Sequence, residues 1–393
     1  MKLLWVKTDF LHPTTRGGQI RSLETLRWLH RWHEVHYVAF DDPATPEGLA
    51  RSGEYCSQAY PVPFEVVKKS SPLFALQLAG GLVSHLPVSV SRYKSASMLR
   101  VVDRVTRSTK FDSIVCDFLF PAPNIPRLSD CVLFQHNVEA TIWRRYVENN
   151  SGLKKIYFQL QAKRMADYEG EVCRAVRKVI AVSEADAQAM RRDYGVQRVD
   201  AAPTGVNLDF FVRPETTEKL ADLVFLGSMD WMPNIDGAVW FAREVLPLIR
   251  AKRPDCTFAI VGRRPAAELQ RLAESDPLIK VTGTVPDVRP WLFGALASIV
   301  PLRVGGGTRL KIYEAMAARA PVVSTTIGAE GLDVTHRENI FIADAASDFA
   351  DRCLALLESA VERERLAAAA WNLVHSKYSW EVVARGMESM IFS

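Results

Sequence analysis

Three glycines followed by two cations form the part of the sequence that is best suited to chemistry. Residues 304–317 read VGGGTRLKIYEAMA, and they follow an apolar run that ends at Leu302. Helical spacing begins near Thr308. Glycines let a backbone approach a ligand closely, and a helix start presents free N–H groups and the positive end of the helix dipole. The pattern therefore predicts an anion site at the start of this helix.

Charged side chains in the first turns of the helix support this interpretation. Arg309 and Lys311 lie where their charge opposes the helix dipole, so a bound anion would explain their position. Glu314 follows Lys311 by one turn and is suited to accept hydrogen bonds from the hydroxyls of a ribose. A glycine-rich loop beside a solvated Lys–Glu pair is the alternative. We expect the ligand to be held by Gly306, Gly307, Thr308, Arg309, Lys311 and Glu314.

The elements that must position these residues alternate in type along the chain. Apolar runs that resemble strands are separated by helix-like segments, which is typical of α/β layers with parallel sheets. Two such series predict two Rossmann-like domains, joined near residues 201–221, where Pro203, Gly205 and Pro214 interrupt the periodicity. We expect an N-terminal domain over residues 1–205, a C-terminal domain over 206–375, and a final helix over 376–393 that packs back toward the N-terminal domain.

In open parallel sheets, ligands bind beyond the carboxyl ends of the strands. Strands are expected at 3–6, 35–40, 113–116, 131–135 and 178–182, and then at 222–226, 257–261, 279–282, 297–302, 321–324 and 340–343. A glycine pair after the first strand could admit a phosphate or an acceptor, or could form a bare turn. His136 could bind a ligand or be a structural histidine. The candidates that follow strand ends are Gly17, Gly18, His136, Gly227, Ser228, Gly262, Arg263 and Val285.

The stretch 304–331 resembles glycosyltransferase family 4. Members carry a glycine-rich loop, a helix with Glu-Ala-Met-Ala, a Pro-Val-Val strand and a glycine turn, and this chain has each of them in order. The family has two glutamates separated by seven residues. Glu314 matches the second, which implies a ribose contact, whereas Gly306 stands where the first would be. The usual carboxylate contact to the donor sugar is therefore absent from this position.

Other segments resemble the same family. The family has a strand end that caps a helix, which residues 182–184 match. The close of its first domain matches residues 202–209, and the opening of its second domain matches residues 225–234. Ser228 stands near the family's arginine. The family often places a phosphate-binding lysine a few residues further on, whereas here no lysine of any kind follows before Lys252. The resemblance implies a GT-B fold, with two Rossmann-like domains facing across a cleft. It also implies retention at the anomeric carbon and a contact between His136 and the donor sugar; Glu139 is a weaker candidate for an acceptor contact.

Several classes of function are disfavoured by what the sequence lacks. It has no Asp-x-Asp pair and no His or Cys spacing typical of metal ligands, so we expect no metal and no cofactor. No Gly-x-Ser-x-Gly marks a hydrolase, and no Gly-x-Gly-x-x-Gly marks a dinucleotide oxidoreductase. A net charge of +4 is too small to indicate a nucleic-acid partner.

The expected location is cytoplasmic, because Lys7 and Asp9 interrupt the apolar start of the chain too early for a signal peptide. The cysteines also form no metal-like pair, and several lie in apolar runs, which fits a reducing compartment. Residues 70–91 carry no formal charge, and basic residues flank them. Proline and glycine make a membrane-spanning helix a poor interpretation. A buried helix and loop is the favoured interpretation. Peripheral membrane contact through residues 68–94, at the inner face of the membrane, is the second one.

Together these features predict a metal-independent, retaining glycosyltransferase that moves a hexose from a nucleoside-diphosphate sugar. The acceptor would be a glycan or a lipid-linked precursor in surface polysaccharide or glycoconjugate synthesis. His136, Arg309 and Lys311 are the expected catalytic residues, of which the two cations would neutralise the departing diphosphate. A GT-B nucleotide-sugar epimerase and a catalytically inactive sugar-nucleotide binding module remain as alternatives.

Overall fold

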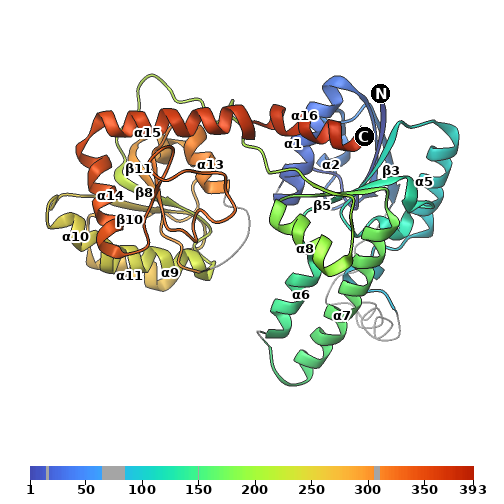
Figure 1. The fold of residues 1–393 in the computed structure, drawn as a ribbon, viewed down its shortest axis with the longest axis horizontal. Coiled ribbons are helices and arrows are strands. Elements are labelled where there is room, and N and C mark those ends of the chain that lie inside the picture. The colour runs from blue at the N-terminus through green and yellow to red at the C-terminus, as the bar shows by residue number, and fades with distance from the viewer. Residues whose placement is uncertain (15–16, 64–84, 149, 305–309) are drawn as a thin grey trace. The chain divides into compact units, whose positions relative to one another are not determined.

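Two parallel β-sheets, one in each half of the chain, organise the structure (Figure 1). The computed structural model describes residues 1–14, 17–63, 85–148, 150–304 and 310–393. One unit comprises Met1–Pro203 together with Val383–Ser393, and the other comprises Thr204–Val382. Helices accompany both sheets, so the predicted α/β class with two Rossmann-like sheets is confirmed.

The sheet of the first unit has seven strands in the order β3-β2-β1-β4-β5-β6-β7, and all neighbours are parallel. The strand order runs outward in both directions from β1 and β4. The topological switch point therefore lies beyond the carboxyl ends of these two strands. The strands are β1 (Lys2–Val6), β2 (Glu34–Asp41), β3 (Gln58–Pro63), β4 (Ser113–Asp117), β5 (Cys131–Gln135), β6 (Lys178–Ala181) and β7 (Val199–Ala201).

Both faces of this sheet are buried. Along β1, Leu4 and Val6 join one apolar cluster, whereas Leu3 and Trp5 join another, because successive side chains of a strand point to opposite faces. Burial on both sides explains why these strands are apolar throughout their length. Among the described residues 1–203, the helical segments are α1 (Gly17–Trp32), α2 (Glu47–Ala50), η1 (Ser52–Glu54), α4 (Val88–Ser91), α5 (Ala96–Ser108), η2 (Ala122–Asn124), η3 (Leu128–Asp130), α6 (Glu139–Glu148), α7 (Gly152–Ala175) and α8 (Glu184–Tyr194).

Strands β3 and β7 are absent from the sequence-based expectation. Pro61 and Pro63 lie in β3, and proline cannot donate to a β-ladder, so the segment does not look like a strand. The position of β3 at the edge of the sheet explains how it tolerates them. Strand β7 lies at the opposite edge and has three residues, too few to show a periodic pattern.

The last helix, α16 (Trp380–Phe392), ends in the first unit. Met387 and Ile391 belong to the same apolar cluster as Leu3 and Trp5. The carbonyl oxygen of Ile391 accepts hydrogen bonds from Ser113 Oγ at 3.0 Å and from the guanidinium of Arg177 at 2.7 Å. The end of the chain is thus a component of the first core.

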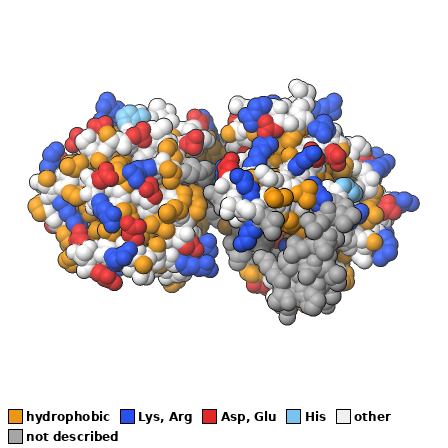
Figure 2. Space-filling view, turned by 90° about the horizontal axis from the view of Figure 1, so that it is seen from below, with side chains coloured by type: hydrophobic (Ala, Val, Ile, Leu, Met, Phe, Trp, Pro, Cys, Tyr) orange, Lys and Arg blue, Asp and Glu red, His pale blue; other side chains and the backbone are white. Residues whose placement is uncertain are grey.

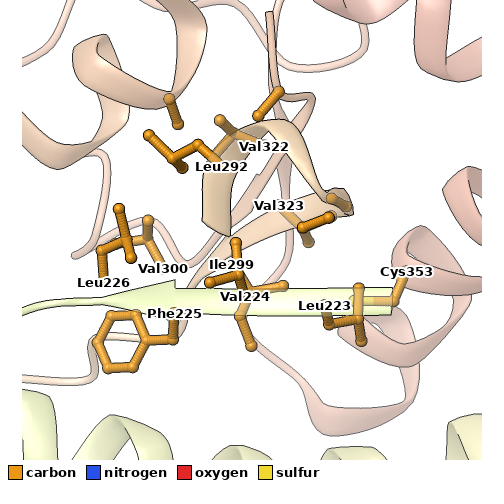
Figure 3. Close-up of a cluster of buried hydrophobic side chains, with 14 of the residues drawn as sticks. Leu223, Val224, Phe225, Leu226, Leu292, Ile299, Val300, Val322, Val323 and Cys353 are labelled. Carbon is orange, nitrogen blue, oxygen red and sulfur yellow. The ribbon is translucent and has the colours of Figure 1, made fainter. Parts of the chain in front are cut away.

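The second unit is built on a six-stranded sheet in the order β10-β9-β8-β11-β12-β13, again with parallel neighbours. Every residue of the central strand β8 is buried, and Leu223 to Leu226 lie among the side chains of the core shown in Figure 3. The strands are β8 (Ala221–Leu226), β9 (Phe258–Val261), β10 (Ile279–Val281), β11 (Ala295–Val300), β12 (Val322–Ser324) and β13 (Phe341–Ile342).

One helical stretch of the second unit is interrupted. Helix α9 (Met232–Trp240) continues through a π-helical segment at Phe241–Val245 into α10 (Leu246–Arg250). Pro247 has no N–H to donate to the preceding turn, which accounts for the change in pitch. The remaining helical segments are α11 (Ala267–Ser275), α12 (Arg289–Phe293), α13 (Leu310–Ala317), α14 (Ala346–Glu358), α15 (Ala360–Leu373) and η5 (Val374–Tyr378).

Within the described ranges, no helix has the length and apolar character needed to cross a membrane. Most of the expected membrane-contact segment 68–94 lies outside the described residues. Its last part includes the short helix α4.

Candidate functional site

Two loops of the second unit meet beyond the carboxyl ends of β8 and β9. Gly227 N donates to the Val261 carbonyl at 3.0 Å, and Arg263 Nε donates to Ser228 Oγ at 3.1 Å. The structure thereby brings together Gly227, Ser228 and Arg263, which the sequence nominates separately. They form a polar rim at the edge of the sheet where a ligand is expected.

Close packing explains the two glycines of this rim. A Cβ atom at Gly262 would overlap the carbonyl oxygen of Gly227. A Cβ at Gly227 would lie 2.6 Å from Nδ2 of Asn234 and 3.1 Å from Nζ of Lys311. Glycine is required at both positions because protein atoms occupy the space around them, and it allows Lys311 to approach the loop backbone.

Lys311 is held at the start of α13 by a buried amide. Its Nζ donates to Asn234 Oδ1 at 2.8 Å and lies 4.7 Å from the centroid of the Phe225 ring. Asn234 Nδ2 in turn donates to the carbonyl oxygen of Ser228 at 2.9 Å. One amide therefore fixes both the cation and the loop after β8. Asn234 is a positioning residue that sequence reasoning missed.

Glu314 lies one turn after Lys311, and its side chain is half-buried. Burial raises the pKa of this carboxyl group, while the charge of Lys311 lowers it. Val285 also follows a strand as expected, but its side chain packs against the second core. The other predicted ligands of this site, Gly306, Gly307, Thr308 and Arg309, lie outside the described residues.

A buried carboxylate occupies the switch point of the first sheet. Asp117, the last residue of β4, accepts hydrogen bonds from Lys7 Nζ at 2.8 Å and His136 Nε2 at 2.6 Å on Oδ1. Its Oδ2 accepts from Trp5 Nε1 at 2.8 Å and Ser22 Oγ at 2.6 Å. Burial alone would raise the pKa of Asp117, but Lys7 and His136 outweigh it and hold the pKa well below its usual range.

Both ring nitrogens of His136 are engaged by protein groups. Nδ1 lies 3.2 Å from the guanidinium of Arg21, which can only donate, so Nδ1 accepts and Nε2 carries the proton given to Asp117. Burial lowers the pKa of His136 to about 4. The ring is therefore neutral at neutral pH. Gly18 lies beside it, since a Cβ there would be 3.6 Å from Nδ1, whereas Gly17 has no such neighbour.

Each half of the chain matches a known family of sequences. Residues 15–210 match the family described as Glycosyltransferase Family 4, and residues 221–359 match Glycosyl transferases group 1. The chain belongs to glycosyltransferase family 4. The resemblance seen in the glycine-rich stretch thus extends over both units of this glycosyltransferase.

Individual relatives of this glycosyltransferase are distant. An uncharacterized 44.6 kDa protein in the cps region of Klebsiella pneumoniae is 22% identical, covering 96% of each chain. A GDP-mannose-dependent monoacylated alpha-(1-6)-phosphatidylinositol monomannoside mannosyltransferase of Corynebacterium glutamicum is 26% identical, covering 49% of this chain and 55% of its own. The solved structure of Anabaena Alr3699/HepE in complex with UDP has a TM-score of 0.64 at 16% identity and covers 99% of both chains. This structural likeness confirms the GT-B fold.

A second buried carboxylate of the glycosyltransferase lies at the start of α6. Glu169 of α7 accepts hydrogen bonds from the backbone N–H groups of Glu139 and Ala140, both at 2.9 Å, and from Tyr194 and Gln135. It thereby caps the start of α6. Burial and the neighbouring Glu169 raise the pKa of Glu139 to about 7. The candidate acceptor contact is thus a carboxyl group that titrates near neutrality.

Asp117, Lys7 and Glu169 are buried charged residues that the sequence analysis did not nominate. Lys7 directly follows the expected first strand, and Asp117 directly follows the expected third, so the strand-end rule points to both. Glu169 gives no such signal, because it lies in the middle of a long helix. Within the described part of the chain, no three His, Cys, Asp or Glu side chains form a group that could hold a metal ion.

Proposed function

We propose that this glycosyltransferase transfers a hexose from a nucleoside-diphosphate sugar with retention at the anomeric carbon and without a metal ion. The acceptor would be a glycan or lipid-linked precursor of a surface polysaccharide or glycoconjugate, on the cytoplasmic side of the membrane. Two relatives support this assignment: one is described by its place in a cps region, and the other is named as a mannosyltransferase that acts on a phosphatidylinositol mannoside.

The position of Lys311 carries the proposal. Its ammonium group is fixed by Asn234 2.8 Å away, beside the loop after β8, and Glu314 follows on the next turn of α13. A cation at this edge of the sheet would bind a diphosphate, and a carboxylate one turn further would accept hydrogen bonds from ribose hydroxyls. The solved Anabaena neighbour holds UDP, a ligand of the same class.

Charge neutralisation would be the main catalytic contribution of this site. When the bond between sugar and diphosphate breaks, negative charge grows on the leaving phosphate. Lys311, together with Arg309 and the start of the helix, would stabilise that charge, and a group fixed in advance needs little reorganisation to do so. The lack of an Asp-x-Asp pair supports assigning this role to protein cations instead of a metal ion.

In the first unit, the hydrogen bonds of His136 leave neither ring nitrogen available for a direct contact with the donor sugar. Its two nitrogens already bond to Asp117 and Arg21, so a direct contact with the donor sugar would require Arg21 to release Nδ1. We propose that His136 acts with Arg21 as a unit, in which the neutral ring orients the guanidinium beside Gly18. No nucleophile of the protein is assigned to the retaining step.

A screen of nucleotide sugars with detection by mass spectrometry tests this function. Each donor is incubated with the protein alone and with candidate acceptors, in the presence and absence of EDTA. Release of a nucleoside diphosphate with transfer or hydrolysis of the sugar, unaffected by EDTA, is the expected result. An epimerised donor without acceptor would instead identify an epimerase. Binding of a nucleoside diphosphate in calorimetry, with no turnover of any donor, would identify an inactive binding module. This module is the second candidate function because glycine at position 306 replaces the family's first glutamate.

A further inference from the structure

A helical hairpin extends away from the sheet of the first unit. Helices α6 and α7 pack against each other and project together beyond the other elements of that unit (Figure 1). Ala140 at the base of α6 and Met165 in α7 are buried in one of the apolar clusters of the unit. Among the described side chains between them, only Trp143 also packs against this cluster. The outer part of the hairpin, described over residues 143–148 and 150–158, is the hairpin tip.

Four aromatic side chains gather at the hairpin tip, and of these Trp143 also packs against the core cluster. The rings of Tyr146 and Phe158 are stacked with centroids 5.5 Å apart, and Trp143 lies 5.9 Å from Tyr146 and 6.2 Å from Phe158. Tyr157 contacts Phe158 in an edge-on arrangement. Half of the Tyr146 side chain and 62% of Ile156 are exposed. An apolar, partly uncovered surface is thus held at the end of a projecting element.

Basic side chains surround this aromatic group. The tip carries four of them, Arg144, Arg145, Lys154 and Lys155, against a single acid, Glu148, and all five are exposed. Arg144 lies 3.6 Å from Asp193, whereas the other three cations form no ion pair with any described residue. By contrast, acidic and basic side chains are interspersed on the face of the second unit visible in Figure 2. The tip therefore concentrates positive charge that the protein leaves uncompensated.

We propose that the hairpin tip binds the surface of a bilayer that contains anionic lipids. Aromatic rings with a polar edge and exposed aliphatic side chains enter the headgroup region, while lysine and arginine attract anionic headgroups. The tip presents all three kinds of group on one element. An acidic protein would match the charge but would not require exposed Tyr146 and Ile156 beside it. The hairpin tip contains none of the candidate donor residues, so this inference does not depend on which sugar is transferred.

Co-sedimentation with lipid vesicles tests the proposal on the full-length protein. Vesicles of phosphatidylcholine containing about one-third phosphatidylglycerol are compared with vesicles of phosphatidylcholine alone. The wild-type protein should bind the anionic vesicles, and binding should weaken as sodium chloride is raised, because salt screens the attraction. Each basic residue near an anionic surface contributes about fivefold in affinity.

Two double variants separate the contributions of the tip. K154E with K155E should weaken binding to anionic vesicles at least about 25-fold, since two cations are lost and two anions gained. Y146S with I156S should weaken binding while preserving its dependence on salt. The matched control is K110E with R271E, which reverses two exposed basic residues elsewhere that form no ion pair with any described residue; it should bind like the wild type.

Three outcomes would overturn the proposal. The wild type does not bind anionic vesicles, the K154E/K155E variant binds them as strongly as the wild type, or the K110E/R271E control loses as much binding as K154E/K155E. Circular dichroism and donor hydrolysis, measured on each variant in solution without lipid, report folding and the donor site independently. Failure of donor hydrolysis in the wild type would contradict the proposed function while leaving the vesicle result intact.

Discussion

The Nε2 atom of His136 lies 2.6 Å from Oδ1 of Asp117, and both side chains are almost completely buried. Lys7 bonds to the same oxygen, and Arg21 bonds to the other ring nitrogen. The histidine is thus one member of a chain of charged and polar groups at the switch point of the first sheet. A buried network of this kind is sensitive to the loss of any member, because the remaining groups keep their desolvation cost.

Asp117→Asn should destabilise the first unit by about 3–5 kcal/mol, because it leaves the ammonium group of Lys7 buried without a counter-charge. The double variant D117N/K7M removes both charges and should recover part of the loss. Denaturant unfolding followed by tryptophan fluorescence measures the wild type, the single variants D117N and K7M, and the double variant. If the double variant is as unstable as the sum of both single variants, the charge pair is not the cause.

Glu139→Gln should change how stability depends on pH. Burial, and next the charge of Glu169, raise the pKa of Glu139 from 4.5 to about 7 in the folded protein. Between these values the folded chain holds a proton that the unfolded chain has released, so the free energy of unfolding falls as pH rises through this window. The amide variant lacks this loss and should become more stable than the wild type by up to about 3 kcal/mol at pH 8.

The measurement for Glu139 is the difference in unfolding free energy between the two proteins at several values of pH from about 4.5 to 8. His136, whose pKa is lowered, gives the opposite slope below its unfolded pKa, but it does so in both proteins and cancels in the difference. A difference that does not vary with pH would show that Glu139 does not titrate in this window.

Lys311→Met should lower the affinity for a nucleoside diphosphate at least about tenfold, since hydrogen bonds to charged groups contribute about 1.5–3 kcal/mol. If Lys311 also stabilises the leaving group, kcat should fall further, by a factor of about 100 or more. Glu314→Gln should weaken binding of the nucleoside but not of inorganic diphosphate. Lys252→Met, at an exposed lysine of the same unit, is the control; titration calorimetry that shows equal affinity for K311M and K252M would remove Lys311 from the site.

Gly262→Ala should disrupt the rim after β8 and β9, because the added Cβ would overlap the carbonyl oxygen of Gly227. We expect a loss of stability of several kcal/mol or a displaced loop with weakened nucleotide binding. Gly386→Ala is the matched control, since no atom lies within 4 Å of its added Cβ; in helix α16 it should stabilise the protein by about 0.5–1 kcal/mol. Thermal unfolding of both variants compares them, and equal midpoints would contradict the packing argument.

The sequence predicted the parts of the fold that depend on local pattern. Apolar runs located β1, β4, β5 and β8, and the strand-end rule placed Ser228 and Arg263 in loops that the structure brings together. It missed β3, where Pro61 and Pro63 are tolerated only because the strand lies at an edge.

Partners in the interior were harder to foresee. Which groups meet Asp117 depends on how β1, β4 and β5 align side by side, and no single segment encodes that alignment. The expected role of His136 was inferred from its position after a strand and from the family resemblance, whereas the structure shows both of its nitrogens already bonded. Similarly, Asn234 becomes meaningful only once α9 and α13 are placed beside the loop after β8.

Helix α16 sets the order in which this protein is completed. Met387 and Ile391 fill the same core as Leu3 and Trp5, although the whole second unit lies between them in the sequence. During synthesis on the ribosome, residues 1–203 emerge first, but the core that they form is incomplete until residues 383–393 have also been translated. The second unit, whose residues are contiguous, can therefore close its own core before the first unit does.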